Sequence, residues 1–183
     1  MTFELIIAIL LAGVLSNNYA LVEFLGTGAV IENERSHKKS LIIGGLTTLV
    51  MIVATLITWP INKYLLQNVP YLQTLVFVLV VLVVVELVHF FTKGRVEGYC
   101  KVDFMKFAIN GAVLGLCIHN THIATLLESV ITSFAVGLGL TLTMIVFSSL
   151  HEKVDEEAVP ASFRGLPITL LIAGMMALAL LAF

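Results

Sequence analysis

Long apolar stretches, each separated from the next by a short polar segment, dominate the pattern of the chain. A membrane helix needs about 20 predominantly apolar residues to cross the hydrocarbon core. The stretches that approach this length predict six transmembrane helices, at residues 3–25, 41–61, 71–91, 104–118, 125–150 and 166–183. Little chain remains for a soluble domain, so we expect a single integral membrane domain over residues 1–183.

Composition and charge agree with this pattern. The chain is 59% hydrophobic and 12% charged, with a mean hydropathy of +1.05, whereas soluble domains typically carry about 25% charged residues. A water-soluble fold is therefore excluded, and the net charge of -2 gives no indication of nucleic-acid binding. The first apolar stretch has no basic residue ahead of it and no clear cleavage site, so we interpret it as a retained span rather than a signal peptide.

The basic residues predict the orientation of the spans. Nine of the ten lysines and arginines lie in the segments that join spans 1 to 2, 3 to 4 and 5 to 6, and only Lys63 lies on the other side. Cytoplasmic loops carry the excess of Lys and Arg. We therefore expect a multi-pass protein of a bacterial or archaeal cytoplasmic membrane with both termini extracytoplasmic. Trp59 and Tyr64 suit the interfacial aromatic belt at the outer end of span 2.

Internal similarity divides the chain into two halves. The segment "GLTTLVMIV" in span 2 resembles "GLTLTMIV" in span 5 with one residue dropped, and Asn17 and Asn110 are separated by nearly the same offset. Three spans per half is an odd number, so the second half enters the membrane inverted, as in many transport and coupling proteins. The predicted fold is an all-α membrane protein with two inverted three-helix repeats, at about 1–91 and 104–183.

Glycines interrupt the first span of each half. Span 1 runs into Gly26 and Gly28, and span 4 contains Asn110-Gly111 and Gly115 in a segment too short for a regular span. Glycine has no Cβ and permits an unwound or re-entrant backbone, although a small-residue packing face is an alternative interpretation. We expect spans 1 and 4 to be broken or re-entrant, with half-helix junctions meeting near the midplane as a candidate binding site.

Polar groups at membrane depth are further candidates, because such groups usually face the bundle interior, a partner or water. Asn17, Asn18 and Glu23 lie beside the first break, where Glu23 could contact backbone amides, a cation or a basic residue of a sister subunit. Glu86 and His89 are three residues apart on span 3. They either hydrogen-bond each other or form an interfacial pair.

The cysteines and histidines give no strong indication of a metal site. Cys100 lies in a predicted cytoplasmic loop, and Cys117 is interpreted as a small apolar filler of span 4. His119 and His122 are interpreted as exposed loop residues, with metal binding as the alternative. The chain has no nucleophile-base pair, P-loop or dinucleotide fingerprint, so an enzyme acting alone is the least expected function.

Three segments carry a family resemblance that covers nearly the whole chain: "SNNYALVEFLG", "NGAVLG" and "VPASFRGLPITLLIAGMMALAL". The sequence resembles the family of RnfA, RnfE, NqrD and NqrE, the paired six-span subunits of Rnf and Na+-translocating NADH:quinone oxidoreductase complexes, and is most similar to the RnfA type. The resemblance implies a non-catalytic subunit that pairs with an oppositely oriented sister and passes electrons across the membrane. Flavin and iron-sulfur groups would lie in partner subunits.

The sequence departs from the family at the positions that would bind a metal. Members carry a cysteine in each broken span, and these thiolates, two from each sister, hold an iron centre at the midplane. Here Gly28 and Gly111 occupy the two cysteine positions. Iron-sulfur centres depend on thiolate ligands, which glycine cannot supply. We therefore expect no metal ligand and no cofactor in this chain.

Two functions are consistent with the sequence. The first is a membrane subunit of an Rnf-like electron transport complex, diverged and without the midplane iron centre. The second is a transporter or channel-like protein that uses the same inverted-repeat scaffold for a small solute or ion. The tail motif and topology favour the first, and the missing ligands favour the second. The expected partners are membrane lipid and a homologous inverted sister subunit or a second copy, with flavoprotein and iron-sulfur subunits in the first case.

Overall fold

The computed structural model describes residues 3–16, 18, 25, 37–66, 69–96, 111–155 and 159–180, and these residues form helices and their connections without a strand. The α-helices are α1 (Phe3–Leu11), α3 (His37–Ile61), α4 (Gln73–Val96), α6 (Gly111–His119), α7 (Leu126–Glu152) and α8 (Leu166–Leu180). Two π-helical segments extend α1 and α3, namely η1 (Ala12–Ser16) and η2 (Asn62–Leu66). Three 3-10 turns complete the described elements: η3 (Pro70–Leu72), η4 (Asn120–His122) and η5 (Ala161–Phe163).

Three of the helices are long and apolar enough to cross a membrane. They cover Ser40–Leu66, Pro70–Phe91 and Leu126–Glu152, which correspond to the predicted spans 2, 3 and 5. Shorter apolar helices at Glu4–Val14 and Leu166–Ala179 correspond to predicted spans 1 and 6. The prediction of an all-helical membrane protein is confirmed.

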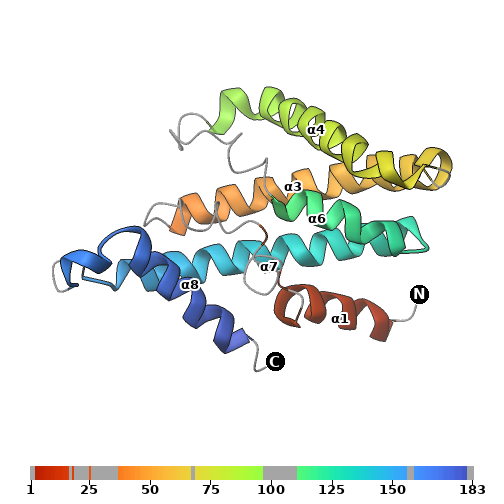
Figure 1. Ribbon diagram of the computed structural model, residues 1–183. Coiled ribbons are helices and arrows are strands. Elements are labelled where there is room, and N and C mark those ends of the chain that lie inside the picture. Colours follow the sequence, from red (N-terminus) through yellow and green to blue (C-terminus); the bar gives the residue numbers. More distant parts are fainter. Residues whose placement is uncertain are drawn as a thin grey trace.

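The helices α3 and α7 form the centre of the arrangement, running antiparallel and side by side along most of their length (Figure 1). Helix α4 packs against α3 and α6 on one side of this pair, and α1 with η1 and α8 pack against α7 on the other. The short helix α6 also contacts α3. Every described α-helix therefore touches one or both members of the central pair.

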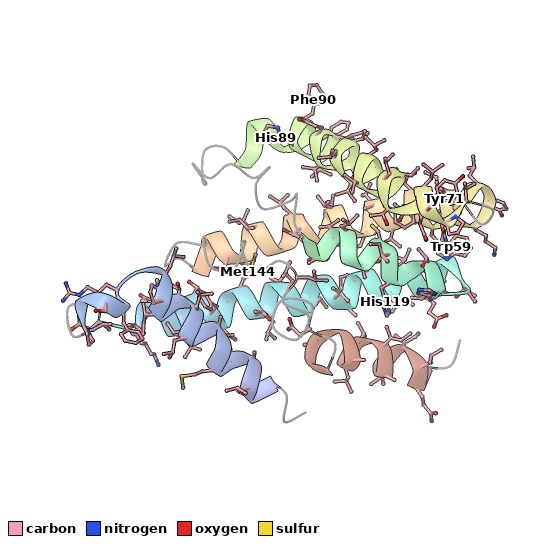
Figure 2. All side chains as sticks on the ribbon, in the orientation of Figure 1. Trp59, Tyr71, His89, Phe90, His119 and Met144 are labelled. Atoms are coloured by element: carbon pink, nitrogen blue, oxygen red, sulfur yellow. The ribbon has the colours of Figure 1, made fainter. Side chains whose placement is uncertain are left out.

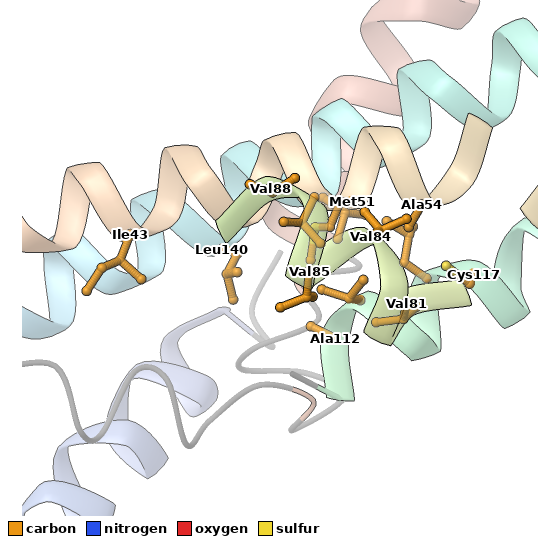
Figure 3. Packing of buried hydrophobic residues seen from close by; sticks show 14 of the residues in the cluster. Ile43, Met51, Ala54, Val81, Val84, Val85, Val88, Ala112, Cys117 and Leu140 are labelled. Atoms are coloured by element: carbon orange, nitrogen blue, oxygen red, sulfur yellow. The ribbon is translucent and has the colours of Figure 1, made fainter. Parts of the chain in front are cut away.

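The main hydrophobic cluster lies where α3, α4 and α6 meet. Figure 3 shows Val81, Val84, Val85 and Val88, which repeat along one face of α4 at helical spacing, among the buried side chains of the cluster. The opposite face of α4 is equally apolar but exposed, and it includes Leu75, Leu79, Val83 and Leu87. A helix that is apolar on both faces suits a position between a protein core and lipid or a partner.

The two ends of the bundle differ in charge. We call the end where α3 finishes and α4 and α7 begin the Trp59 end, and the opposite end the Arg164 end (Figures 1 and 2). Lys63 lies at the Trp59 end. The helix bounds place the backbones of six other basic residues near the Arg164 end: Lys38, Lys39, Lys93, Arg95, Lys153 and Arg164. The remaining basic residues, Arg35, Lys101 and Lys106, lie outside the described residues.

The string "VPASFRG" forms the entry into α8. The amide of Phe163 donates to the carbonyl oxygen of Pro160 at 2.8 Å, which closes the 3-10 turn, and Arg164 Nε donates to the carbonyl oxygen of Val159 at 2.9 Å. Gly165 follows with a φ of 79°, a left-handed conformation that glycine adopts without steric cost. The string therefore has a structural reason to hold its Pro, Arg and Gly at these spacings.

Candidate functional site

The structure describes three of the residues that the sequence predicts for a site. Asn18 is buried, Gly111 is the exposed first residue of α6, and Gly115 is half-buried one turn later. The other candidates lie outside the described residues: Asn17, Glu23, Gly26, Gly28 and Asn110. The junction of two half-helices near the midplane therefore stays a prediction.

Asn18 connects the first short helix to the middle of α7. Its side chain is 1% exposed, and its Nδ2 donates to Thr143 Oγ1 at 2.8 Å and to the carbonyl oxygens of Val14 and Gly139 at 3.2 and 3.3 Å. An unpaired carboxamide at membrane depth would cost several kcal/mol, roughly, so these contacts are strong constraints. Asn18 thereby fixes the position of the η1 end of the helix.

Small residues allow η1 to approach α7 closely at the same level. A Cβ at Gly139 would lie 2.6 Å from the carbonyl oxygen of Gly13, and a Cβ at Gly13 would lie 2.7 Å from Cβ of Ala135. Neither position has room for a methyl group. Gly13 and Gly139 thus form a small-residue helix contact of the kind common in membrane proteins. The sequence reasoning offered this interpretation for other glycines and did not identify this pair.

A second buried polar cluster lies at the η4 end of α6, where sequence reasoning placed no candidate. Asn120 Nδ2 donates to Ser133 Oγ at 3.0 Å and to Thr55 Oγ1 at 3.1 Å, and these two hydroxyls lie 2.7 Å apart. Ser133 Oγ also donates to the carbonyl oxygen of Ser129 at 2.7 Å. The available signal was an asparagine closing an apolar run and two serines four residues apart on α7.

The oxygen of the Asn120 side chain has no hydrogen-bond partner, although the residue is 1% exposed. A buried carbonyl oxygen without a donor is costly, and such an atom commonly binds an ordered water or faces a functional partner. The cluster therefore joins α3, α6 and α7 and leaves one acceptor unused.

Two reciprocal glycine-threonine contacts hold α3 against α7. A Cβ at Gly44 would lie 2.6 Å from Thr141 Oγ1, and a Cβ at Gly137 would lie 2.5 Å from Thr48 Cγ2. Gly44 and Gly137 are 93 residues apart in the sequence, and so are Thr48 and Thr141. Each helix thus contributes one glycine and one threonine to the crossing, in equivalent positions.

The remaining ionisable and sulfur-containing candidates are dispersed. Cys117 is 1% exposed within the hydrophobic cluster, whereas His119 and His122 are exposed at the Trp59 end. On α4, Glu86 is exposed and His89 is half-buried. Among the described residues no three His, Cys, Asp or Glu side chains form a group that could hold a metal ion.

The residues at the expected iron positions do not fit an iron centre. Gly111 is exposed at the start of α6 and has no side chain, and Gly28 likewise supplies no ligand atom. The nearest thiol along α6 is Cys117, six residues further on, and it points into the core between α3, α4 and α6 (Figure 3). A thiolate in that apolar cluster cannot replace the missing ligand.

The long apolar helices, the small-residue crossings and the buried polar contacts between helices define a polytopic α-helical membrane protein. The chain belongs to the family described as "Rnf-Nqr subunit, membrane protein", whose model matches residues 6–183.

Its relatives include proteins named as the A-type subunit of the ion-translocating oxidoreductase complex. The relative from Sodalis glossinidius is 35% identical, and the match covers 93% of this chain and 91% of the relative. The relative from Syntrophotalea carbinolica is 34% identical, with 97% and 95% covered, and one from Escherichia coli is 34% identical, with 93% and 91% covered. The similarity therefore extends over nearly the full length of both partners in each comparison.

Proposed function

We propose that the chain is a membrane subunit of an Rnf-like electron transport complex and that it lacks the midplane iron centre. The similarity over residues 6–183 carries this proposal, because it includes both short helices and the Arg164 turn rather than a shared apolar pattern alone. Iron-sulfur and flavin groups then belong to partner subunits. The transporter alternative has no comparable support, since no described feature specifies a solute.

The inverted repeat is part of the same proposal. The spacing of 93 residues that relates the two glycine-threonine contacts also relates Ser40 to Ser133 and Thr55 to Ser148, and all four hydroxyls are buried. An antiparallel pair of helices whose equivalent residues make equivalent contacts is what an inverted duplication produces. We assign the repeats to about 1–91 and 104–183, as the sequence predicts.

The proposed orientation places the Arg164 end in the cytoplasm, because that end carries the excess of basic residues. Single cysteines at Ser162 and Tyr64, both exposed, sample the two ends in a Cys100→Ser background. In intact cells an impermeant maleimide should label the cysteine at position 64 and spare the one at 162. The reverse result would contradict the orientation.

Iron content tests the missing centre. The wild-type protein, purified with its partner subunits, should have no stoichiometric iron attributable to this chain, and Gly28→Cys combined with Gly111→Cys should increase the iron content if the family geometry persists. The matched control is Gly45→Cys combined with Gly174→Cys, two positions where a Cβ has open space and no iron site is expected. Elemental analysis and absorption spectra provide the measurement.

The outcomes separate loss of the centre from loss of the complex. Iron in the wild type that disappears when this chain is removed would overturn the vacated-site proposal. Copurification with flavin-containing and iron-sulfur subunits supports membership of the complex whatever the iron result. Purification without them, combined with solute uptake into vesicles by this chain alone, would favour the transporter alternative.

A further inference from the structure

A cavity of about 160 Å³ opens at the Trp59 end, between the end of α3 and the segment that leads into α7. It is lined by Trp59, Asn62, Lys63, Thr121, His122, Ile123 and Ala124. One water occupies about 30 Å³ of liquid volume. The cavity therefore has room for a polar group considerably larger than a single water.

Hydrogen bonds within the protein use the acceptors and leave an excess of donors. Trp59 Nε1 donates to the carbonyl oxygen of Ile123 at 3.0 Å, and Asn62 Oδ1 accepts from Gln73 Nε2 at 2.9 Å. The hydroxyl of Thr121 donates back to the carbonyl oxygen of Ile118 at 2.7 Å.

The groups left to face a ligand are donors. Within the described residues no hydrogen bond occupies the ammonium of Lys63, and the same holds for the Asn62 amide nitrogen and the His122 ring. An imidazole has at least one N–H in either charge state. A half-open cavity with one fixed positive charge and several donors is suited to an anion with oxygen acceptors.

Lys63 is positioned by the helix rather than by an acidic partner. Its ammonium lies 4.6 Å from the centre of the Trp59 ring, one helical turn earlier, and no carboxylate lines the cavity. A cation-π contact at an exposed position contributes about 0.5–1 kcal/mol, so it orients the ammonium without neutralising its charge.

The surroundings of the cavity belong to a membrane boundary. Tyr64 and Tyr71 are 79% and 81% exposed at the same end of the bundle, and Leu65 beside the cavity is 69% exposed. Figure 2 shows Trp59 and Tyr71 together at this end. Exposed aromatic side chains of this kind lie at the level of lipid headgroups, with the apolar helix surface below them.

We propose that this cavity binds the phosphate group of an anionic phospholipid, with Lys63, Asn62 and His122 as donors and the exposed Leu65 and neighbouring apolar surface in contact with its acyl chains. The lipid source follows from the position of the cavity, because a polar group entering at this level comes from a headgroup. The proposed site is independent of electron transfer and of the iron positions.

Trp59 is the only tryptophan in the chain, so its fluorescence reports on the cavity directly. The protein is reconstituted with a fixed fraction of brominated phosphatidylglycerol or brominated phosphatidylcholine in an unbrominated background, and quenching is compared. A basic residue near a membrane surface contributes about 1 kcal/mol toward anionic lipid, which corresponds to about a fivefold preference. We expect brominated phosphatidylglycerol to quench at about fivefold lower mole fraction than brominated phosphatidylcholine.

Three variants assign the preference to the site. Lys63→Gln should remove most of the difference between the two lipids, and Lys63→Arg should retain it. Lys153→Gln is the matched control, since Lys153 is exposed at the opposite end of the bundle and its loss should leave Trp59 quenching unchanged. If Lys63→Gln does not fold, His122→Ala provides a second test and should weaken the preference.

Two results would overturn the proposal. Equal quenching by the two brominated lipids in the wild type would show that Trp59 senses only bulk lipid. Relief of phosphatidylglycerol quenching by soluble glycerol phosphate at equal concentration would assign the cavity to a free anion instead of a lipid.

Discussion

At the scale of single residues, the two buried asparagines have different environments. The Asn18 amide donates to three acceptors of the first helix and α7, whereas Asn120 uses only its nitrogen and leaves its oxygen unpaired. The sequence identified Asn18 as a candidate because a carboxamide at membrane depth needs partners. It did not identify Asn120, since an asparagine at the end of an apolar run can equally face water. Burial decided this case, and burial depends on the position of neighbouring helices.

Asn18→Asp provides a test at this scale, because it keeps the size of the side chain and removes the donor. The carboxylate would face the carbonyl oxygen of Gly139, so we expect a loss of about 3 kcal/mol or more and a lower thermal unfolding temperature in detergent. Asn62→Asp is the control, since the oxygen that accepts from Gln73 is retained there. Fluorescence-detected size-exclusion chromatography after heating provides the measurement. Equal stability of Asn18→Asp and wild type would show that the Asn18 contacts do not hold the helix.

At the scale of helices, the sequence predicted the three long spans closely, because uninterrupted apolar runs of that length have few alternatives. Prediction was weaker for the helix ends and for packing. Pro60 lies inside α3, where its missing N–H and the following π-helical turn extend the helix end in a way that hydropathy does not show. The choice of buried face was also hidden, because helices in lipid are apolar on both sides. The positions of Gly44 and Gly137 against threonines could be seen only in three dimensions.

The central crossing gives a prediction for a pair of helices. Gly44→Ala and Gly137→Ala each place a methyl group against a threonine, so each should destabilise by about 1–3 kcal/mol, and the two losses should be similar if the halves are equivalent. Gly45→Ala is a control on the adjacent residue, where a Cβ meets nothing within 4 Å. It should be neutral or stabilising by up to about 1 kcal/mol, because alanine favours a helix. A large loss at Gly45, or none at Gly44 and Gly137, would argue against the crossing as described.

At the scale of the whole molecule, several helices are too short to cross the membrane alone. Helix α8 has 15 residues and would span about 22 Å, and α6 with nine residues about 14 Å, against a hydrocarbon core of about 30 Å. Both α1 and α8 lie on the side of α7 away from α4 (Figure 1) and expose large apolar residues there, among them Leu5, Leu11, Met175 and Leu178. This face is where we expect the inverted sister subunit or a second copy to pack.

The pairing face is tested with matched tryptophan substitutions. Met175→Trp on α8 should obstruct close packing and shift the protein from a pair toward single copies, measured by native mass spectrometry in mild detergent. Leu79→Trp is the control, because Leu79 is similarly exposed, at 56% against 64% for Met175, but lies on α4, which packs on the other side of the central pair. Lipid accommodates an extra ring more readily than a packed helix interface does, so Leu79→Trp should leave the pair intact. Dissociation by Leu79→Trp alone would place the partner on α4, and a wild type that is a stable monomer and functions when reconstituted by itself would refute the pairing.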